Sequence, residues 1–186
     1  MPDSFAPLNQ PDQPFTPDAD EFRRALRPLI GQVSVITMMG GKGAMGMTFT
    51  SANALSMQPP MLIACINRSA SLHGSLELGA VLGWQALGAG QQAVADRFAG
   101  KDGITGAARF AGAVWRDETH GGAAVRLLDG ANLACAVQIA SLADHATHTV
   151  VVARILSLKS MPQAGILAYR DGQYLPFEAG TLPPQA

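Results

Sequence analysis

The pattern of hydrophobic and polar positions predicts a chain made mostly of strands, preceded by one helix. The helix is expected to begin at Thr16-Pro17-Asp18, which supply a cap, a proline for the first turn and an acidic charge at the positive end of the helix dipole. Apolar residues then fall on one helical face, at Phe22, Ala25, Leu26 and Leu29. Pro28 and Gly31 predict the end of this helix.

Strands follow the helix in quick succession. The β-branched run over 32–39 predicts a strand, GGKG over 40–43 a turn, and 45–53 a second strand. The apolar run MLIACI predicts a third strand over 61–66, buried on both faces. A short helix is expected after Ser71.

The second half of the chain repeats the strand pattern around one more helix. Residues 91–99 are expected to be helical and to end at Gly100, and part of 79–90 is expected to be a strand. Further strands are predicted near 113–117, 124–128, 132–142 and 148–158, with a last hairpin around Asp171-Gly172. Such hairpin spacing predicts a mainly β fold with flanking helices, an antiparallel barrel with its helices outside.

Proline content divides the chain. Residues 1–17 carry five prolines and predict an extended N-terminal arm. Residues 18–178 are expected to form the single domain, and 179–186 a C-terminal tail.

Composition narrows the class of protein. Of the 186 residues, 48% are hydrophobic and 15% charged, and the net charge of -1 gives no basic excess for nucleic acid or a lipid surface. Cys65 and Cys135 lie in apolar runs and are expected to be buried, reduced thiols. No signal-peptide pattern and no membrane-span pattern is visible, so we expect a cytoplasmic protein.

Two polar clusters bracket the predicted third strand. Small polar side chains precede it, at Thr48, Thr50, Ser51, Asn53 and Ser56. Asn67-Arg68-Ser69 follow it and combine an amide, a guanidinium and a hydroxyl, a set that suits a phosphate. Turn formation at the strand ends explains the same residues equally well, so both interpretations stay open.

Other catalytic templates are absent from the sequence. No nucleophile elbow, P-loop or HExxH motif occurs. His145 and His148 could touch one metal, but a zinc site normally has at least three protein ligands, and no third is obvious. We therefore expect no metal.

Four segments in order resemble the flavin-reductase-like family, which has the FMN-binding split barrel and includes reductase components of two-component flavin-dependent monooxygenases. They are GMTFTSANALSMQPPMLIACINRSASLH, QQAVADRFAGKDG with ARFAGAVWR, HATHTVVVARILSL, and ILAYRDGQY. The resemblance covers roughly 20 to 177 and implies an antiparallel split β-barrel. It implies an NAD(P)H:flavin oxidoreductase that transfers a hydride from NADH or NADPH to FMN or FAD.

The resemblance also implies roles for individual residues. The flavin ring and ribityl chain would lie along Thr50, Ser51, Ala52 and Asn53. The phosphate end would be held by Asn67, Arg68, Ser69 and Ser71. His148 matches a histidine near the flavin and the nicotinamide, and is the candidate catalytic residue. The sequence departs from the family pattern at Ala52, Gln85 and Ala146-Thr147, which leaves the choice of flavin and of nucleotide open.

Partners and alternatives follow from the same resemblance. A homodimer is expected, and so is a separate oxygenase that receives reduced flavin. One alternative is a flavin-binding electron carrier or sensor without NAD(P)H activity. Another is a structural barrel that has lost its cofactor.

Overall fold

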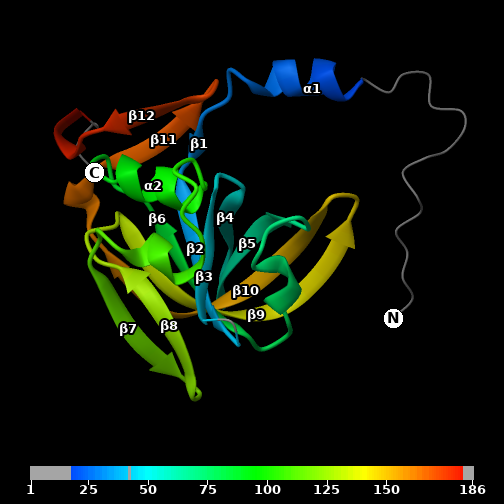
Figure 1. The fold of residues 1–186 in the computed structure, drawn as a ribbon, viewed down its shortest axis with the longest axis vertical. Coiled ribbons are helices and arrows are strands. Elements are labelled where there is room, and N and C mark those ends of the chain that lie inside the picture. Colours follow the sequence, from blue (N-terminus) through cyan, green and yellow to red (C-terminus); the bar gives the residue numbers. More distant parts are fainter. Residues whose placement is uncertain (1–17, 42, 182–186) are drawn as a thin grey trace, which may run out of the picture.

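One curved antiparallel sheet dominates the molecule (Figure 1). The computed structural model describes residues 18–41 and 43–181. Seven strands follow the spatial order β3-β2-β6-β9-β10-β5-β4. Their bounds are β2 Ser34–Gly40, β3 Gly43–Phe49, β4 Ala52–Met57, β5 Pro60–Asn67, β6 Val81–Ala86, β9 Leu133–His145 and β10 His148–Ser160.

The sheet curls because its two edge strands are consecutive in the chain. β3 and β4 stand at opposite ends of the strand order, yet only Thr50 and Ser51 separate them. The two edges must therefore meet at these residues and diverge from them. The Cys65 amide donates to the Ser51 oxygen at 2.9 Å, which extends the β4–β5 ladder up to this junction. The predicted mainly β, antiparallel split barrel is confirmed.

Smaller elements surround the large sheet. β1 (Gly31–Gln32), β11 (Ile166–Arg170) and β12 (Gln173–Phe177) form a second sheet, and β7 (Trp115–His120) pairs with β8 (Ala123–Leu128). The α-helices among the described residues are α1 (Ala19–Leu26) and α2 (Gln92–Phe98). Short 3-10 turns cover His73–Ser75, Gly106–Phe110, Pro162–Ala164 and Ala179–Thr181.

Two hydrophobic clusters hold these layers together. One fills the inside of the curled sheet and includes Ile36, Leu62, Ile66, Leu82, Val137 and Val151. The other lies between the opposite face of β2, β6 and β9 and the elements α2 and β8, and includes Val35, Leu87, Phe98, Val125 and Leu127. Gly46 lets β3 approach this second cluster, because a Cβ there would lie 2.8 Å from the Phe98 ring.

The hairpins and the second helix are where the sequence predicted them. β2 and β3 pair from Gly40↔Gly43 outward, and β9 and β10 pair along most of their length. Asp171 and Gly172 take positive φ values of 47° and 84° at the turn between β11 and β12. α2 buries Phe98 and is followed by Gly100, also at positive φ.

The predicted strand over 45–53 was wrong in its extent. The chain breaks at Thr50-Ser51, and a separate strand, β4, follows at Ala52–Met57. The break arises because the chain leaves one edge of the sheet for the other at this point. β4 is mostly exposed, and its larger apolar residues Leu55 and Met57 point away from the core, so no pattern of buried positions marked it.

Three expectations around the third strand were also wrong. β5 is buried on one face only: Leu62, Ala64 and Ile66 point inward, while the alternating residues remain partly exposed. After Ser71 the chain makes a single 3-10 turn, His73–Ser75, and no α-helix. The expectation that both cysteines are buried was wrong for Cys65, which lies on the partly exposed face of β5, whereas Cys135 is buried; both thiols are free.

α1 stands away from the sheets in Figure 1. The Asp18 side chain caps it by accepting from the amides of Asp20 and Glu21. None of its residues is buried, and Phe22 within it and Leu29 just beyond its end are 57% and 62% exposed. The helix therefore begins later than predicted, because Asp18, which was expected inside the first turn, is itself the N-cap. Its apolar face meets no core in the described part of the chain.

The expected arm over 1–17 and residues 182–186 of the expected tail lie outside the described residues. Within the described part of the chain, no helix is long and apolar enough to cross a membrane.

Candidate functional site

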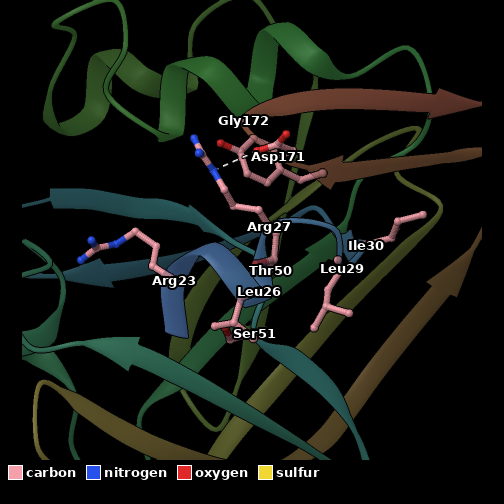
Figure 2. A pocket seen from close by; sticks show the side chains of 11 residues that line it. Arg23, Leu26, Arg27, Leu29, Ile30, Thr50, Ser51, Asp171 and Gly172 are labelled. Atoms are coloured by element: carbon pink, nitrogen blue, oxygen red, sulfur yellow. Dashed lines mark ion pairs between the residues drawn. The ribbon is translucent and has the colours of Figure 1, made fainter. Parts of the chain in front are cut away.

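Clefts open at both ends of β3, which pairs with β2 on one side only. At its C-terminal end a cleft of about 440 Å³ is bordered by Thr50 and Ser51 (Figure 2). Arg23 of α1 and Arg27, which follows the last residue of α1, also line this cleft. The Arg27 Nε lies 2.9 Å from Asp171 on the final hairpin. The junction of the two sheet edges therefore forms the floor of an open cleft.

A second cleft of about 240 Å³ continues the first, since the two share Thr50 and Tyr169. Its wall is aromatic and cationic. The Tyr169 and Tyr174 rings lie 5.4 Å apart, and Lys101 Nζ lies 4.5 Å from the centre of the Tyr174 ring. A hydrogen bond to Asp96 raises the pKa of Lys101, so this cation is fixed at neutral pH.

The predicted ring-side residues lie together at the edge junction. The Thr50 side chain packs against Gly31 of β1, where a Cβ would lie 2.9 Å from the Thr50 Cβ. Thr50, Ser51 and Asn53 are exposed, whereas Ala52 packs against the cluster inside the sheet. Two hydroxyls and one amide therefore remain available to a ligand.

The turn after β5 uses part of its polar chemistry internally. The Asn67 Oδ1 accepts from the Ser69 amide and from the Ser69 hydroxyl, each at 2.8 Å. This is the turn chemistry that the sequence left open. The Arg68 guanidinium is about half exposed and lies 3.5 Å from the Ala146 oxygen and 3.9 Å from Asp144.

His148 stands beside this turn. It pairs with Asn67 across β5 and with His145 across β9. Its Nδ1 lies 2.9 Å from the Thr147 hydroxyl, and the ring is partly exposed. The structure thus brings His148 and the 67–69 turn together. Asn67 lies two residues after Cys65 on β5, and the Cys65 amide donates a hydrogen bond to the Ser51 oxygen.

A chain of hydrogen bonds behind the turn was not expected from the sequence. The buried Thr149 hydroxyl donates to Asp144 at 2.5 Å and lies 2.7 Å from His73 Nε2. Because the single Thr149 proton is used on Asp144, His73 Nε2 must be the donor to Thr149. The bond from Thr149 lowers the pKa of Asp144, and the nearby Arg68 acts in the same direction.

Ser71 lies apart from the rest of the predicted phosphate set. It lines a cleft of about 290 Å³ at the N-terminal half of β3, with Met45, Gly46, Thr105 and Arg109. Sequence reasoning missed Thr105 and Arg109. Arg109 donates a hydrogen bond to the oxygen of Gly46 on β3, which lies 63 residues earlier in the sequence, so no local pattern could have indicated this contact.

Within residues 18–41 and 43–181, no group of three potential ligands could hold a metal ion. Gln85, one of the departures from the family pattern, is fully buried and donates to Thr37 and to the Arg126 oxygen. The candidate site is therefore a set of hydroxyls, amides and cations at the β3–β4 junction, at the turn after β5 and beside the N-terminal half of β3. Such a set suits an elongated anionic ligand with a flat polar end.

Comparisons with known proteins agree with this geometry. The family model described as "Flavin reductase like domain" matches residues 26–178. A relative from Pseudomonas syringae, named FMN reductase (NADH) RutF, is 33% identical over 153 residues, which cover 82% of this chain and 83% of the relative. A relative of the same name from Variovorax paradoxus is 31% identical over 87% of this chain and 86% of its own length.

Solved structures show the same fold. BorF, the flavin reductase component of a bacterial two-component tryptophan halogenase, is 26% identical with a TM-score of 0.75, over 87% of this chain and 99% of BorF. The NADH:FAD oxidoreductase SgcE6 of Streptomyces globisporus, in complex with NAD and FAD fragments, has a TM-score of 0.74 at 24% identity, over 86% of this chain and 93% of SgcE6. On the evidence of its fold and of the family model, this chain belongs to the flavin reductase like family.

Proposed function

We propose that this protein is an NADH:flavin oxidoreductase that binds flavin along the unpaired edge of β3. The observation that carries the proposal is the edge junction at Thr50-Ser51, which leaves polar groups free beside open clefts in a chain of this family. A bound flavin supplies the hydride acceptor at its N5, and NADH supplies the hydride from C4. The protein needs no nucleophile, because its task is to hold two rings face to face.

The ring end of the site is the edge junction. Thr50, Ser51 and Asn53 present hydroxyl and amide groups to the polar edge of a flavin ring. Ala52 adds the backbone of the first β4 residue, while its side chain packs against the cluster inside the sheet. The clefts on the far side of Thr50, with their tyrosines and cations, leave space for a nucleotide beside the ring.

The phosphate end is the turn after β5. Asn67 and Ser69 fix the turn through their mutual hydrogen bonds, so their main role is to shape it. Arg68 offers a cation at the surface of the turn, while Ser71 offers a hydroxyl in the separate cleft beside β3. A guanidinium and a hydroxyl are both suitable donors to a phosphate monoester.

His148 is proposed to face the nicotinamide. It stands at the first residue of β10, next to Asn67, and is not part of the hydrophobic core. A neutral imidazole can donate a hydrogen bond to a carboxamide or stack on a ring without placing a charge in the path of the hydride.

FMN and NADH are the proposed pair of substrates, because the relatives above 30% identity carry the name FMN reductase (NADH). FAD and NADPH remain the comparison ligands in any assay. A separate oxygenase that consumes the reduced flavin is proposed as the partner. BorF, a component of a two-component halogenase, supports this arrangement.

We also propose a homodimer that works in the cytoplasm. Apolar side chains stay exposed on α1 and β4, with Leu55 and Met57 48% and 73% exposed, and a second copy would cover them. Unpaired Cys65 and Cys135 fit a reducing compartment.

The direct test is NADH oxidation by the purified protein with added FMN, measured against the same FMN without protein. We expect saturable turnover well above the free-flavin background. Flavin binding without NADH oxidation would instead support an electron carrier or sensor. Absence of any flavin-induced rise in melting temperature would mean that the barrel does not bind the cofactor.

A further inference from the structure

Among the residues that the structure describes, one partly buried arginine has no carboxylate beside it. Four arginines are partly buried in the described residues. Arg97, Arg116 and Arg126 each have a nitrogen within 3.5 Å of a carboxylate oxygen. Arg109 pairs with no carboxylate of residues 18–41 or 43–181. Because a desolvated charge is costly unless it is paired, the lack of a carboxylate among the described residues leaves Arg109 able to take an anion as its counter-ion.

The hydrogen bonds of Arg109 hold its guanidinium in place without neutralising it. Nε donates to the Ile104 oxygen at 2.8 Å. Nη1 donates to the oxygens of Gly46 at 3.1 Å and Phe98 at 3.4 Å. Backbone oxygens fix the side chain between β3 and the 98–110 loop, and its full positive charge remains. A cation held in this way is preorganised to bind an anion.

The surroundings of Arg109 have the chemistry of a phosphate site. Arg109 lines the cleft of about 290 Å³ together with the hydroxyl residues Ser71 and Thr105. Gly46 and Gly106 complete part of the wall, so the backbone can approach a ligand closely. A guanidinium and two hydroxyls around a small cleft match the acceptor oxygens of a phosphate group.

We propose that Arg109, with Ser71 and Thr105, binds the phosphate-bearing end of the flavin and supplies the main positive charge of that subsite. The inference rests on the proposed function and deepens it. Gly46 lies four residues before Thr50 on the same strand edge, roughly 13 Å away at the usual rise per residue. This separation suits a flavin whose ring lies at Thr50 and whose ribityl phosphate follows β3 back to Arg109.

Arg68 is the competing cation and plays the smaller part. Its side chain is about half exposed and already lies near Asp144, which partly cancels its charge. Solvent further weakens any interaction it makes. Ser71, three residues later, lines the Arg109 cleft, so the phosphate can keep contact with the turn without depending on Arg68.

The test compares FMN with riboflavin, which lacks the phosphate, by fluorescence titration of the full-length protein. For Arg109→Gln we expect FMN affinity to fall roughly tenfold or more, as for a lost charge-assisted hydrogen bond, and riboflavin affinity to fall less than about twofold. Arg109→Lys should lie between Arg109→Gln and the wild type. Ser71→Ala should lose FMN affinity about threefold, and Arg68→Gln should lose less than Arg109→Gln. Arg24→Gln, an exposed arginine of α1, is the neutral control.

Each outcome decides the proposal. Equal losses for FMN and riboflavin in Arg109→Gln would show that Arg109 only braces the loop. Unchanged flavin affinity with a raised KM for NADH would assign the cleft to a nucleotide phosphate. Either result overturns the proposal, as does a larger FMN-specific loss in Arg68→Gln. If Arg109→Gln does not fold, the loss of FMN affinity relative to the loss of riboflavin affinity in Arg109→Lys and Ser71→Ala decides the question. The titrations need no NADH, so the subsite can stand even if the oxidoreductase proposal fails.

Discussion

At the scale of single residues, we expect His148 to act in nucleotide binding and not in flavin binding. The ring is partly exposed beside the 67–69 turn, and its Nδ1 bonds a neighbouring threonine hydroxyl, so its other edge is available to a ligand. For His148→Ala we expect a higher KM for NADH and a lower kcat. The flavin Kd should change less than about threefold, or about 0.7 kcal/mol. Steady-state kinetics and a flavin titration measure the two effects. A collapse of flavin affinity with an unchanged KM would move His148 to the flavin site.

Single residues of the candidate site could be predicted from the sequence only where several polar side chains lie close together along the chain. Thr50, Ser51 and Asn53 could be predicted because hydroxyls and amides are concentrated in one short stretch next to a strand. Ser69 could also be noticed, but its bond to Asn67 depends on the turn that the chain makes. Arg109 could not be predicted, because the sequence does not show which arginine has no carboxylate beside it in the described fold.

At the scale of elements, β3 depends on a close approach that only glycine allows. A Cβ on Gly46 would lie 2.5 Å from the Ile36 oxygen and 2.8 Å from the Phe98 ring. We expect Gly46→Ala to destabilise the protein by about 1–3 kcal/mol, the usual cost of overpacking, and to weaken flavin binding as β3 shifts. Gly41→Ala is the matched control, because nothing lies within 4 Å of a Cβ there. Similar denaturant midpoints for the two variants would contradict this account.

A second element-scale feature is the attachment of the β7–β8 ribbon to β10. The Ser157 hydroxyl of β10 donates to Glu118 of β7 at 2.6 Å. Burial opposes ionisation of Glu118, but hydrogen bonds from Ser157, His120 and Arg116 outweigh it and lower the pKa below the ordinary 4.5. A carboxylate with a lowered pKa stabilises the fold above its unfolded pKa, and this stabilisation is lost as the pH falls through the folded value.

We therefore expect the wild type to lose stability as the pH drops below about 4.5. Glu118→Gln should be less stable by about 1.5–3 kcal/mol at neutral pH and should lose less on acidification. Urea unfolding at several pH values measures both effects. Glu77→Gln, at an exposed glutamate, is the control. An unchanged acid dependence in Glu118→Gln would show that this attachment does not involve the charge.

Elements were predictable where the pattern is local. The hairpins between β9 and β10 and between β11 and β12 carry clear alternation and turn residues, and α2 has a helical period and a closing glycine. β4 was missed because it is an edge strand with mostly exposed residues, so its sequence carries no alternation between buried and exposed positions. The 3-10 turn at His73–Ser75 was predicted as a longer helix because a capping serine alone does not set how many helical turns come after it.

At the scale of the whole molecule, the curled sheet could be expected from hairpin spacing, but its strand order could not. That order joins β9 to β6 and β10 to β5 across long stretches of sequence. Only this pairing makes the consecutive strands β3 and β4 opposite edges, and that in turn creates the site. The sequence predicted an apolar face on α1, but it could not predict that this face stays exposed within the described part of the chain.

The exposed apolar surface leads to a prediction about assembly. Phe22 and Leu29 near α1 and Met57 on β4 are each more than half exposed. A low net charge of -1 leaves close approach unopposed. We expect sedimentation equilibrium to give about twice the monomer mass of 19.4 kDa. Phe22→Ser should weaken association, and a wild-type mass equal to that of the monomer would contradict the dimer.

The central claim is that a flavin held along β3 accepts a hydride from NADH. An anaerobic stopped-flow experiment tests it most directly, by mixing the protein saturated with FMN with one equivalent of NADH and following flavin bleaching. We predict a rapid loss of oxidised flavin, stoichiometric with NADH and far faster than for free FMN, with slower bleaching in His148→Ala. Bleaching at the rate of free FMN, in a sample where FMN is demonstrably bound, would contradict the account.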